Sequence, residues 1–228
     1  MFFTIDIDGV LARDMNGYAR YLNTYFSLGI AEEVINQMGN YLEFTQLPQV
    51  KQYAAQSDDA CKQINEVAKQ AQYSAEVQAQ KVPVPGALSS IQELSERYPF
   101  CYVTARKSET IKVTQQWLAS YGFPNPSQVY CCDQGIYQKY LYAYELAGSD
   151  PIIMIDDLAL RVMKSFATVV KYHYAIAKAL RPKLALYAFG HETSPAWPFK
   201  VEPFPVWPLP NWQHFDTLIG TERQETLS

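Results

Sequence analysis

Short apolar runs alternate with amphipathic stretches over the second half of the chain. Leu88, Ile91 and Leu94 recur at the spacing of one helix face, which predicts a helix over 87–97. Strands that are apolar throughout and alternate with helices are typical of a parallel sheet covered on both faces. The pattern therefore predicts an α/β fold with a Rossmann-like parallel sheet. We expect strands at 2–5, 100–104, 129–131, 151–155 and 183–189, and further helices at 108–122, 136–147 and from 158 into 178.

A long segment without any strand pattern separates the first expected strand from the second. Residues 16–80 are rich in Ala, Gln, Tyr and Leu, and almost no helix breaker occurs over 48–80. The prolines and glycine of 82–86 (VPVPG) end this helical block and stiffen the connection that follows. We predict a core domain of residues 1–14 and 84–228, interrupted by an inserted helical domain of residues 15–83.

Two carboxylates stand at the end of the first expected strand. Asp6 and Asp8 are two residues apart, so in an extended chain both side chains point to the same face. At about 4 Å, two like charges repel by about 4 kcal/mol even at an effective dielectric constant of about 20. This cost indicates that the pair holds a cation, a proton with a shifted pKa, or both. Gly9 then allows the backbone to turn sharply.

Polar residues also follow two other expected strands. Thr104 ends the second strand, and Asp156 and Asp157 follow the fourth. Ligands of parallel α/β sheets bind at the carboxyl ends of the strands, where these side chains would meet. Several carboxylates together favour a hard, oxygen-preferring cation. The sequence therefore predicts a functional site at this edge of the sheet.

Composition and charge exclude several classes of partner. Hydrophobic residues make up 48% of the 228 residues and charged residues 18%, as in an ordinary globular protein. A net charge of −4 provides no basic surface for a nucleic-acid duplex or an anionic membrane. No uncharged apolar stretch approaches the length of about 18 residues that a membrane span needs, and the N-terminus does not resemble a secretory signal. The four cysteines lack metal-ligand spacing, so we expect reduced thiols in a cytoplasmic protein.

Four short motifs, in order, resemble the haloacid dehalogenase-like (HAD) hydrolase superfamily over about two thirds of the chain. The run DIDGVL at 6–11 is similar to the first motif, and IMIDD at 153–157 to the fourth. Thr104, in VTAR at 103–106, is similar to the second, and Lys139 fits the third by its position before the fourth strand. The first and fourth motifs together carry most of the resemblance.

The resemblance assigns a role to each matching residue. It implies that Asp6 is the nucleophile that forms an aspartyl-phosphate, and that Asp8 is the general acid and base. Thr104, Ala105 and Lys139 would bind the substrate phosphate. Arg106 would bind a phosphate or carboxylate of the substrate, or form a surface ion pair. The implied Mg²⁺ ligands are Asp6, Asp8 through its backbone carbonyl, and Asp156 or Asp157.

The second aspartate narrows the chemistry that the resemblance implies. Superfamily members that cleave carbon–halogen or carbon–phosphorus bonds usually lack a carboxylate at the position of Asp8. We therefore expect a phosphatase acting on a small phosphomonoester. A phosphotransferase or mutase on the same scaffold, and a non-catalytic binding protein of this fold, remain the alternatives.

The helical insertion would be a cap of the family's first type. Between Asp8 and Thr104 lie 95 residues, enough for such a lid. Within the superfamily, two features look most like the 5′(3′)-deoxyribonucleotidase-like group. One is the first motif followed by Ala12, and the other is the run from VTAR at 103–106 to Thr114, Trp117 and Leu118. A nucleotide or a sugar phosphate is therefore among the expected substrates. Aromatic rings near the start of the lid would stack on a base or form the lid's own core: Tyr18, Tyr21, Tyr25 and Phe26.

The segment 194–212 is unusually rich in proline and aromatic residues, among them Trp197, Trp207 and Trp212. It is either a polyproline ligand for an SH3-like partner or an irregular wrap whose rings pack on the core. The wrap is favoured, because so many large rings are costly to leave exposed.

Overall fold

A six-stranded, fully parallel sheet forms the centre of the molecule. The computed structural model describes residues 1–38, 41–71, 74–190 and 204–215. The strand order is β3-β2-β1-β4-β5-β6, and every neighbouring pair runs parallel. The α/β fold with a Rossmann-like sheet, predicted from the sequence, is confirmed. The strands are β1 (Phe2–Ile5), β2 (Phe100–Thr104), β3 (Val129–Cys131), β4 (Ile152–Asp156), β5 (Leu184–Phe189) and β6 (Val206–Leu209).

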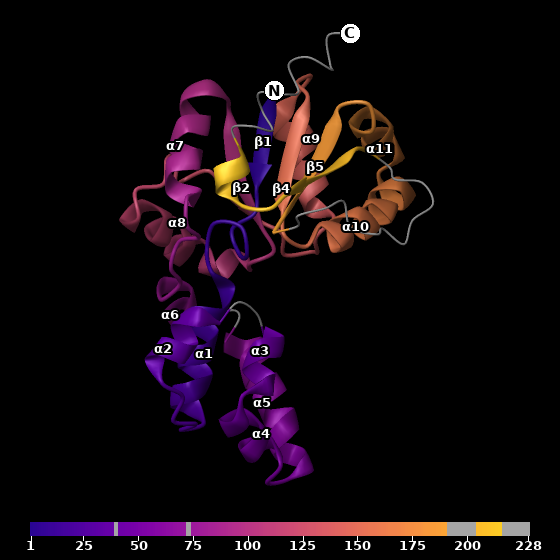
Figure 1. Cartoon of the computed structure of the whole chain (residues 1–228). Helices are drawn as coiled ribbons and strands as arrows, with labels where there is room; N and C mark the ends of the chain where they lie inside the picture. The colour runs from indigo at the N-terminus through magenta and orange to yellow at the C-terminus, as the bar shows by residue number, and fades with distance from the viewer. Residues whose placement is uncertain (39–40, 72–73, 191–203, 216–228) are drawn as a thin grey trace.

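Helices cover both faces of the sheet (Figure 1). Phe3 and Ile5 of β1 point into one apolar cluster, which includes residues of α7 (Ala87–Arg97) and α8 (Ile111–Ser120). Phe2 points into the opposite cluster, which the other helices line. Burial on both faces explains why these strands are apolar throughout, since alternate side chains enter different clusters. The helices of the second cluster are α9 (Gln138–Ala147), α10 (Ala159–Tyr172) and α11 (Tyr174–Leu180).

Between β1 and α7, the described residues (those other than 39–40 and 72–73) include six helices, which form a separate lobe seen below the sheet in Figure 1. The lobe has its own apolar cluster, which includes Leu22, Phe44 and Ile64. The several helices predicted over 16–80 are thereby confirmed, whereas the exact division into domains at 15–83 stays a prediction. The helices are α1 (Asp14–Tyr25), α2 (Glu32–Gln37), α3 (Tyr41–Gln46), α4 (Pro48–Ala54), α5 (Asp58–Ala71) and α6 (Ala75–Ala79).

Two chain passages connect the helical lobe to the sheet, and they pair with each other. The amide N–H of Arg13 donates to the Val82 carbonyl at 2.8 Å, and that of Val84 donates to the Leu11 carbonyl at 2.8 Å. Ala12 and Pro83 form an antiparallel bridge between these bonds. The VPVPG linker is therefore one side of a two-stranded junction directly after the first motif.

Two local expectations were wrong. The helix predicted from 158 into 178 is two helices, because His173 has φ −137° and ψ 50°, outside the helical region. The short 3₁₀ helix Ser108–Thr110 likewise precedes α8 in the helix predicted at 108–122.

The Pro- and Trp-rich segment is not an irregular wrap where the structure describes it. Its residues 206–209 form the parallel edge strand β6, in which Pro208 is tolerated because an edge strand has one unpaired side. Trp212 is buried as expected, and its Nε1–H donates to the Val10 carbonyl at 2.8 Å, whereas Trp207 is 42% exposed. Trp197 lies outside the described residues, and the polyproline alternative stays untested.

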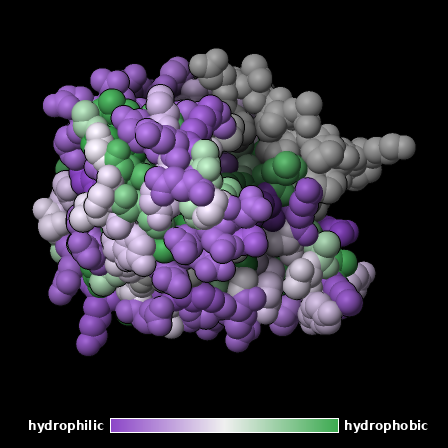
Figure 2. All heavy atoms as spheres, turned by 90° about the horizontal axis from the view of Figure 1, so that it is seen from below, coloured by the Kyte–Doolittle hydropathy of each residue, from purple (hydrophilic) through white to green (hydrophobic). Residues whose placement is uncertain are grey.

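The surface seen from the end of the helical lobe is mostly hydrophilic, with small groups of hydrophobic residues between (Figure 2). Among the helices within the described ranges, none combines the length and the apolar character needed to cross a membrane.

Candidate active site

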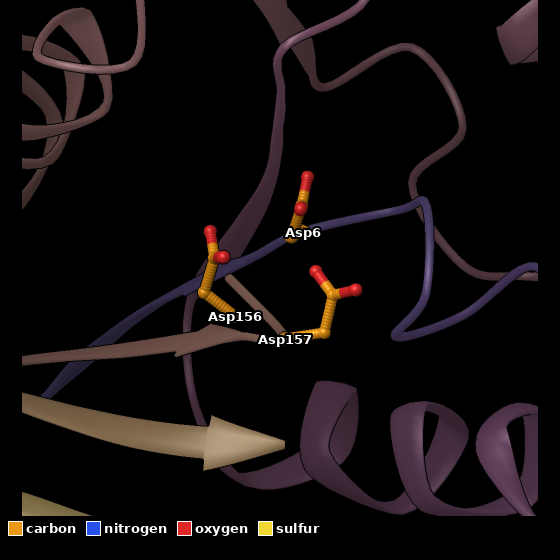
Figure 3. Close-up of side chains that lie close together, drawn as sticks. All are labelled: Asp6, Asp156 and Asp157. Carbon is orange, nitrogen blue, oxygen red and sulfur yellow. The ribbon is translucent and has the colours of Figure 1, made fainter. Parts of the chain in front are cut away.

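Three carboxylates converge at the carboxyl ends of two adjacent strands. Asp6 directly follows β1, Asp156 ends β4 and Asp157 comes next (Figure 3). One oxygen of each lies within 4.8 Å of the others. The parallel pairing of β1 with β4 places Ile5 opposite Ile155, so both strands end at the same level. Sheet register thus brings together residues that are 150 positions apart in the sequence.

Gly9 leaves room for the third carboxylate. Its φ of +79° suits glycine, and a Cβ at this position would lie only 2.0 Å from Oδ2 of Asp157. Any larger residue would therefore displace Asp157 or the loop. The glycine seen in the first motif has a role in shaping the site as well as in turning the chain.

Lys139 contacts two of these three carboxylates. It lies in the first turn of α9 and is 3% exposed. Its Nζ is 3.1 Å from Oδ2 of Asp6 and also contacts Oδ2 of Asp156. Although burial alone would lower the pKa of Lys139, the two carboxylates outweigh it and hold that pKa above its usual value. Lys139 is therefore charged, at the place that the third motif predicts.

Asp6 is buried, and only some of its polar atoms have a hydrogen-bond partner. Its backbone N–H donates to the Ile155 carbonyl at 2.9 Å, while its side-chain Oδ1 has no hydrogen-bond partner among the residues that the structure describes. Burial raises the pKa of Asp6 to about 7, because Lys139 only partly offsets the loss of hydration and the charges of Asp156 and Asp8 add to the rise.

These features fit a bound divalent cation. A buried carboxylate oxygen without a partner is costly unless something binds it. Three converging carboxylates with only oxygen donors are the ligand chemistry of Mg²⁺ rather than of zinc. Asp156 makes one further hydrogen bond, because its Oδ1 accepts from the Leu158 amide at 2.8 Å.

Asp8 is turned to a different set of partners. The guanidinium of Arg106 donates to both of its oxygens, from Nε at 2.8 Å and from Nη2 at 2.6 Å. Lys81 donates to its Oδ1 at 2.6 Å. Although burial alone would raise the pKa of Asp8, Arg106 and Lys81 hold it well below its usual range. Asp8 is thus a carboxylate fixed by two cations in this arrangement.

Thr104 and Ala105 lie at the end of β2, as the sequence predicts. Arg106 is buried and pairs with Asp8, and so is not in a surface ion pair. Thr104 is fully buried at the end of β2, and its Oγ1 accepts from the Arg106 amide at 3.2 Å. Its hydroxyl proton can therefore still be donated to a phosphate oxygen. Ala105 is exposed beside it. The side chain of Arg106 is 3% exposed and binds Asp8 and Thr114, whose Oγ1 accepts from Nη1 at 3.0 Å.

Lys81 is the residue that sequence reasoning missed. It is 1% exposed, and its carbonyl accepts from Nε1 of Trp117 at 2.7 Å. Its Nζ is also 5.5 Å from the ring centre of Tyr18 in α1. Its only sequence signal is its position directly before the VPVPG linker, and a single lysine there does not predict a buried one.

The aromatic residues expected near the start of the lid mostly form its own packing. Tyr18 is buried in the lobe's apolar cluster, and Tyr21 and Phe26 pack against that cluster. Tyr25 is 60% exposed and stacks on Tyr21. This arrangement favours the structural interpretation of these rings over base stacking.

Comparisons with known proteins identify the fold. No family model matches the chain, and no curated protein matches it. Among solved structures, a HAD family hydrolase from Deinococcus radiodurans with bound phosphate and sodium is 13% identical, with a TM-score of 0.55, covering 96% of this chain and 94% of that one. The HAD-hydrolase YfnB from Bacillus subtilis, bound to magnesium, is 11% identical with a TM-score of 0.58, covering 96% and 98%. A HAD-superfamily hydrolase from Geobacter sulfurreducens is 14% identical with a TM-score of 0.54, covering 96% of each chain. The chain therefore has the fold of the haloacid dehalogenase-like hydrolases.

Proposed function

We propose that this protein is a Mg²⁺-dependent phosphatase that hydrolyses a small phosphomonoester through an aspartyl-phosphate on Asp6. The observation that carries the proposal is the convergence of three carboxylates and a buried lysine at the ends of β1 and β4. The fold supports it, because solved neighbours of this fold are named hydrolases, one with bound phosphate and one with bound magnesium.

Asp6, Asp156 and Asp157 would hold the cation, which when bound neutralises negative charge on the phosphoryl oxygens. Lys139 and the Thr104 hydroxyl bind the same oxygens from the protein side. Lys139 also favours the ionised form of Asp6, because its ammonium is 3.1 Å from Oδ2 and partly offsets the rise in the pKa of Asp6 caused by burial. Together these groups orient the phosphorus toward a carboxylate oxygen of Asp6 and stabilise the charge that develops during transfer.

The reaction then proceeds in two displacements at phosphorus. An oxygen of Asp6 bonds to phosphorus as the bond to the leaving alcohol oxygen breaks. Because Arg106 and Lys81 hold Asp8 ionised in the free protein, Asp8 must first take up a proton from solvent, and it then gives this proton to the leaving oxygen. In the second displacement Asp8 takes a proton from water as the water oxygen attacks phosphorus. The bond between phosphorus and Asp6 breaks, which releases inorganic phosphate and restores both carboxyl groups.

The position of the helical lobe favours a small substrate. It lies beyond the carboxyl ends of the strands, where it would cover a bound metabolite and exclude water (Figure 1). A nucleotide or a sugar phosphate fits this class. The aromatic packing inside the lobe gives the nucleotide no special support.

The test uses Asp6→Asn, a change that keeps the size of the side chain and removes the nucleophile. We expect loss of Mg²⁺-dependent phosphate release from p-nitrophenyl phosphate and from a panel of phosphorylated metabolites. Asp59→Asn is the matched control, because Asp59 is exposed on α5 in the helical lobe. Full activity in Asp6→Asn would contradict the mechanism.

Two further measurements separate the alternatives. An added alcohol that becomes phosphorylated would identify a phosphotransferase rather than a hydrolase. A wild-type protein that releases no phosphate with or without Mg²⁺ would indicate a non-catalytic protein of the same fold.

A further inference from the structure

The carboxyl group of Asp8 lies apart from the three-carboxylate cluster. The oxygens that come within 4.8 Å of one another belong to Asp6, Asp156 and Asp157, and none belongs to Asp8. Instead Arg106 binds both Asp8 oxygens in a fork, which fixes the plane of the carboxylate as well as its position. The general acid of the proposed reaction is therefore held on the side of Lys81 and Arg106.

Arg106 is itself held in place by the sheet domain. Its Nη1 donates to the Thr114 hydroxyl in α8, and its backbone follows β2. The Thr114 hydroxyl in turn donates to the Thr110 carbonyl at 2.9 Å. These contacts hold Arg106 against α8, so one of the two cations on Asp8 belongs to the sheet domain.

Lys81 belongs to the junction between the helical lobe and the sheet. It lies between α6 and the paired passages at Ala12 and Pro83. Its carbonyl binds Trp117 in α8, and its ammonium lies over the ring of Tyr18 in α1. Lys81 therefore contacts both the sheet domain, through its carbonyl, and the lobe, through its ammonium, and a shift of α1 would change the surroundings of the ammonium that binds Asp8.

We propose that Lys81 is a positioning residue that sets the orientation of the Asp8 carboxyl group and so links the lobe junction to proton transfer. The proposal rests on the proposed function, because it takes Asp8 as the proton donor. Lys81 acts through Asp8 and needs no contact with substrate. Lys81 suits this role because it is fully buried and its Nζ donates to Asp8 at 2.6 Å, whereas a solvent-exposed lysine would hold the carboxylate less firmly.

The leaving group reports on this role. A proton from Asp8 matters most when the departing oxygen is a poor leaving group, as in an alkyl phosphate, and little for p-nitrophenyl phosphate. Lys81→Met keeps the length of the side chain and removes its charge. We expect kcat/KM for an alkyl phosphate to fall at least about tenfold more than kcat/KM for p-nitrophenyl phosphate, since general acid catalysis contributes about 10²–10⁴.

A double-mutant cycle shows whether Lys81 acts through Asp8. Asp8→Asn should show the same selective loss, and adding Lys81→Met to it should lower kcat/KM for the alkyl ester by less than about twofold. Lys81→Arg, which keeps the positive charge, should retain most of the wild-type activity. Lys62→Met is the matched control, because Lys62 is exposed on α5. Thermal melting verifies that each variant folds, and Lys81→Gln replaces Lys81→Met in the cycle if the latter does not.

The outcomes separate this inference from the proposed function. If Lys81→Met lowered kcat/KM equally for both substrates, or if the effects of Lys81→Met and Asp8→Asn were independent, the role of Lys81 would be overturned. Hydrolysis by the wild type would still uphold the proposed phosphatase. No Mg²⁺-dependent hydrolysis by the wild type would overturn the proposed function and this inference with it.

Discussion

Replacing Asp6 by Asn should abolish turnover and at the same time stabilise the metal-free protein. The carboxyl group is buried, and its pKa is raised from 3.8 to about 7. Between about pH 4 and pH 7, Asp6 is therefore protonated in the folded protein and ionised in the unfolded chain. Stability contributed by this proton is fully present below about pH 4 and is lost as the pH rises through 7.

The magnitude follows from the difference between the two pKa values. Each pH unit corresponds to about 1.4 kcal/mol, so ionised Asp6 costs the metal-free wild type about 4 kcal/mol at pH 8. About 2.5 kcal/mol of this loss falls between pH 5 and pH 8. Asn has no charge to lose, so the corresponding pH dependence should be absent from Asp6→Asn.

The assay is urea unfolding of both proteins at pH 5 and pH 8 in the presence of a chelator. The free-energy gap between Asp6→Asn and the wild type should widen by about 2.5 kcal/mol at pH 8. Adding Mg²⁺ should then stabilise the wild type, by about 2.7 kcal/mol at 100 times its dissociation constant, and leave the variant unchanged. Parallel pH dependence in the two proteins would refute the account of Asp6 as a buried group with a raised pKa.

Three further changes test other parts of the structure. Lys139→Met should abolish activity and lower the free energy of unfolding by about 3–5 kcal/mol at pH 8, because it leaves buried carboxylates without their cation; urea unfolding measures this. Gly9→Ala should remove the Mg²⁺-induced rise in melting temperature, since its Cβ would meet a carboxylate oxygen at 2.0 Å. Gly29→Ala, also at positive φ but with nothing within 4 Å, should retain that rise, and equal responses would contradict the steric explanation. Trp212→Phe should cost about 1–3 kcal/mol in urea unfolding because a buried carbonyl loses its donor, whereas the exposed Trp207→Phe should cost little.

Local pattern was sufficient for most of the sheet. The expected bounds of β2, β3 and α7 agree with the structure, because apolar runs and helical periodicity report directly on burial. The same reasoning failed for β6, where Pro208 and the neighbouring rings conceal an edge strand, and at His173, where one helix becomes two. β6 pairs with β5, and His173 stacks on Tyr137, and a local pattern reports neither contact.

The sequence by itself determined which residues could meet at the carboxyl edge of the sheet. Asp6, Asp156 and Asp157 each follow an apolar strand, and parallel strands end at a common edge, so their convergence needs only the order of the elements. Lys139 followed from its position before β4 and its resemblance to a motif, and the structure places it against Asp6.

Only the tertiary structure decided how Asp8 is oriented and what holds it. Spacing predicts that Asp6 and Asp8 share a face, yet the loop after β1 turns Asp8 toward Arg106, 98 positions away, and Lys81, 73 positions away. Side chains so far apart in sequence meet only when the lobe junction and the sheet are both in place. The physical reason is that periodicity constrains the direction of a side chain within one element, whereas the partner of a charge depends on how separate elements pack.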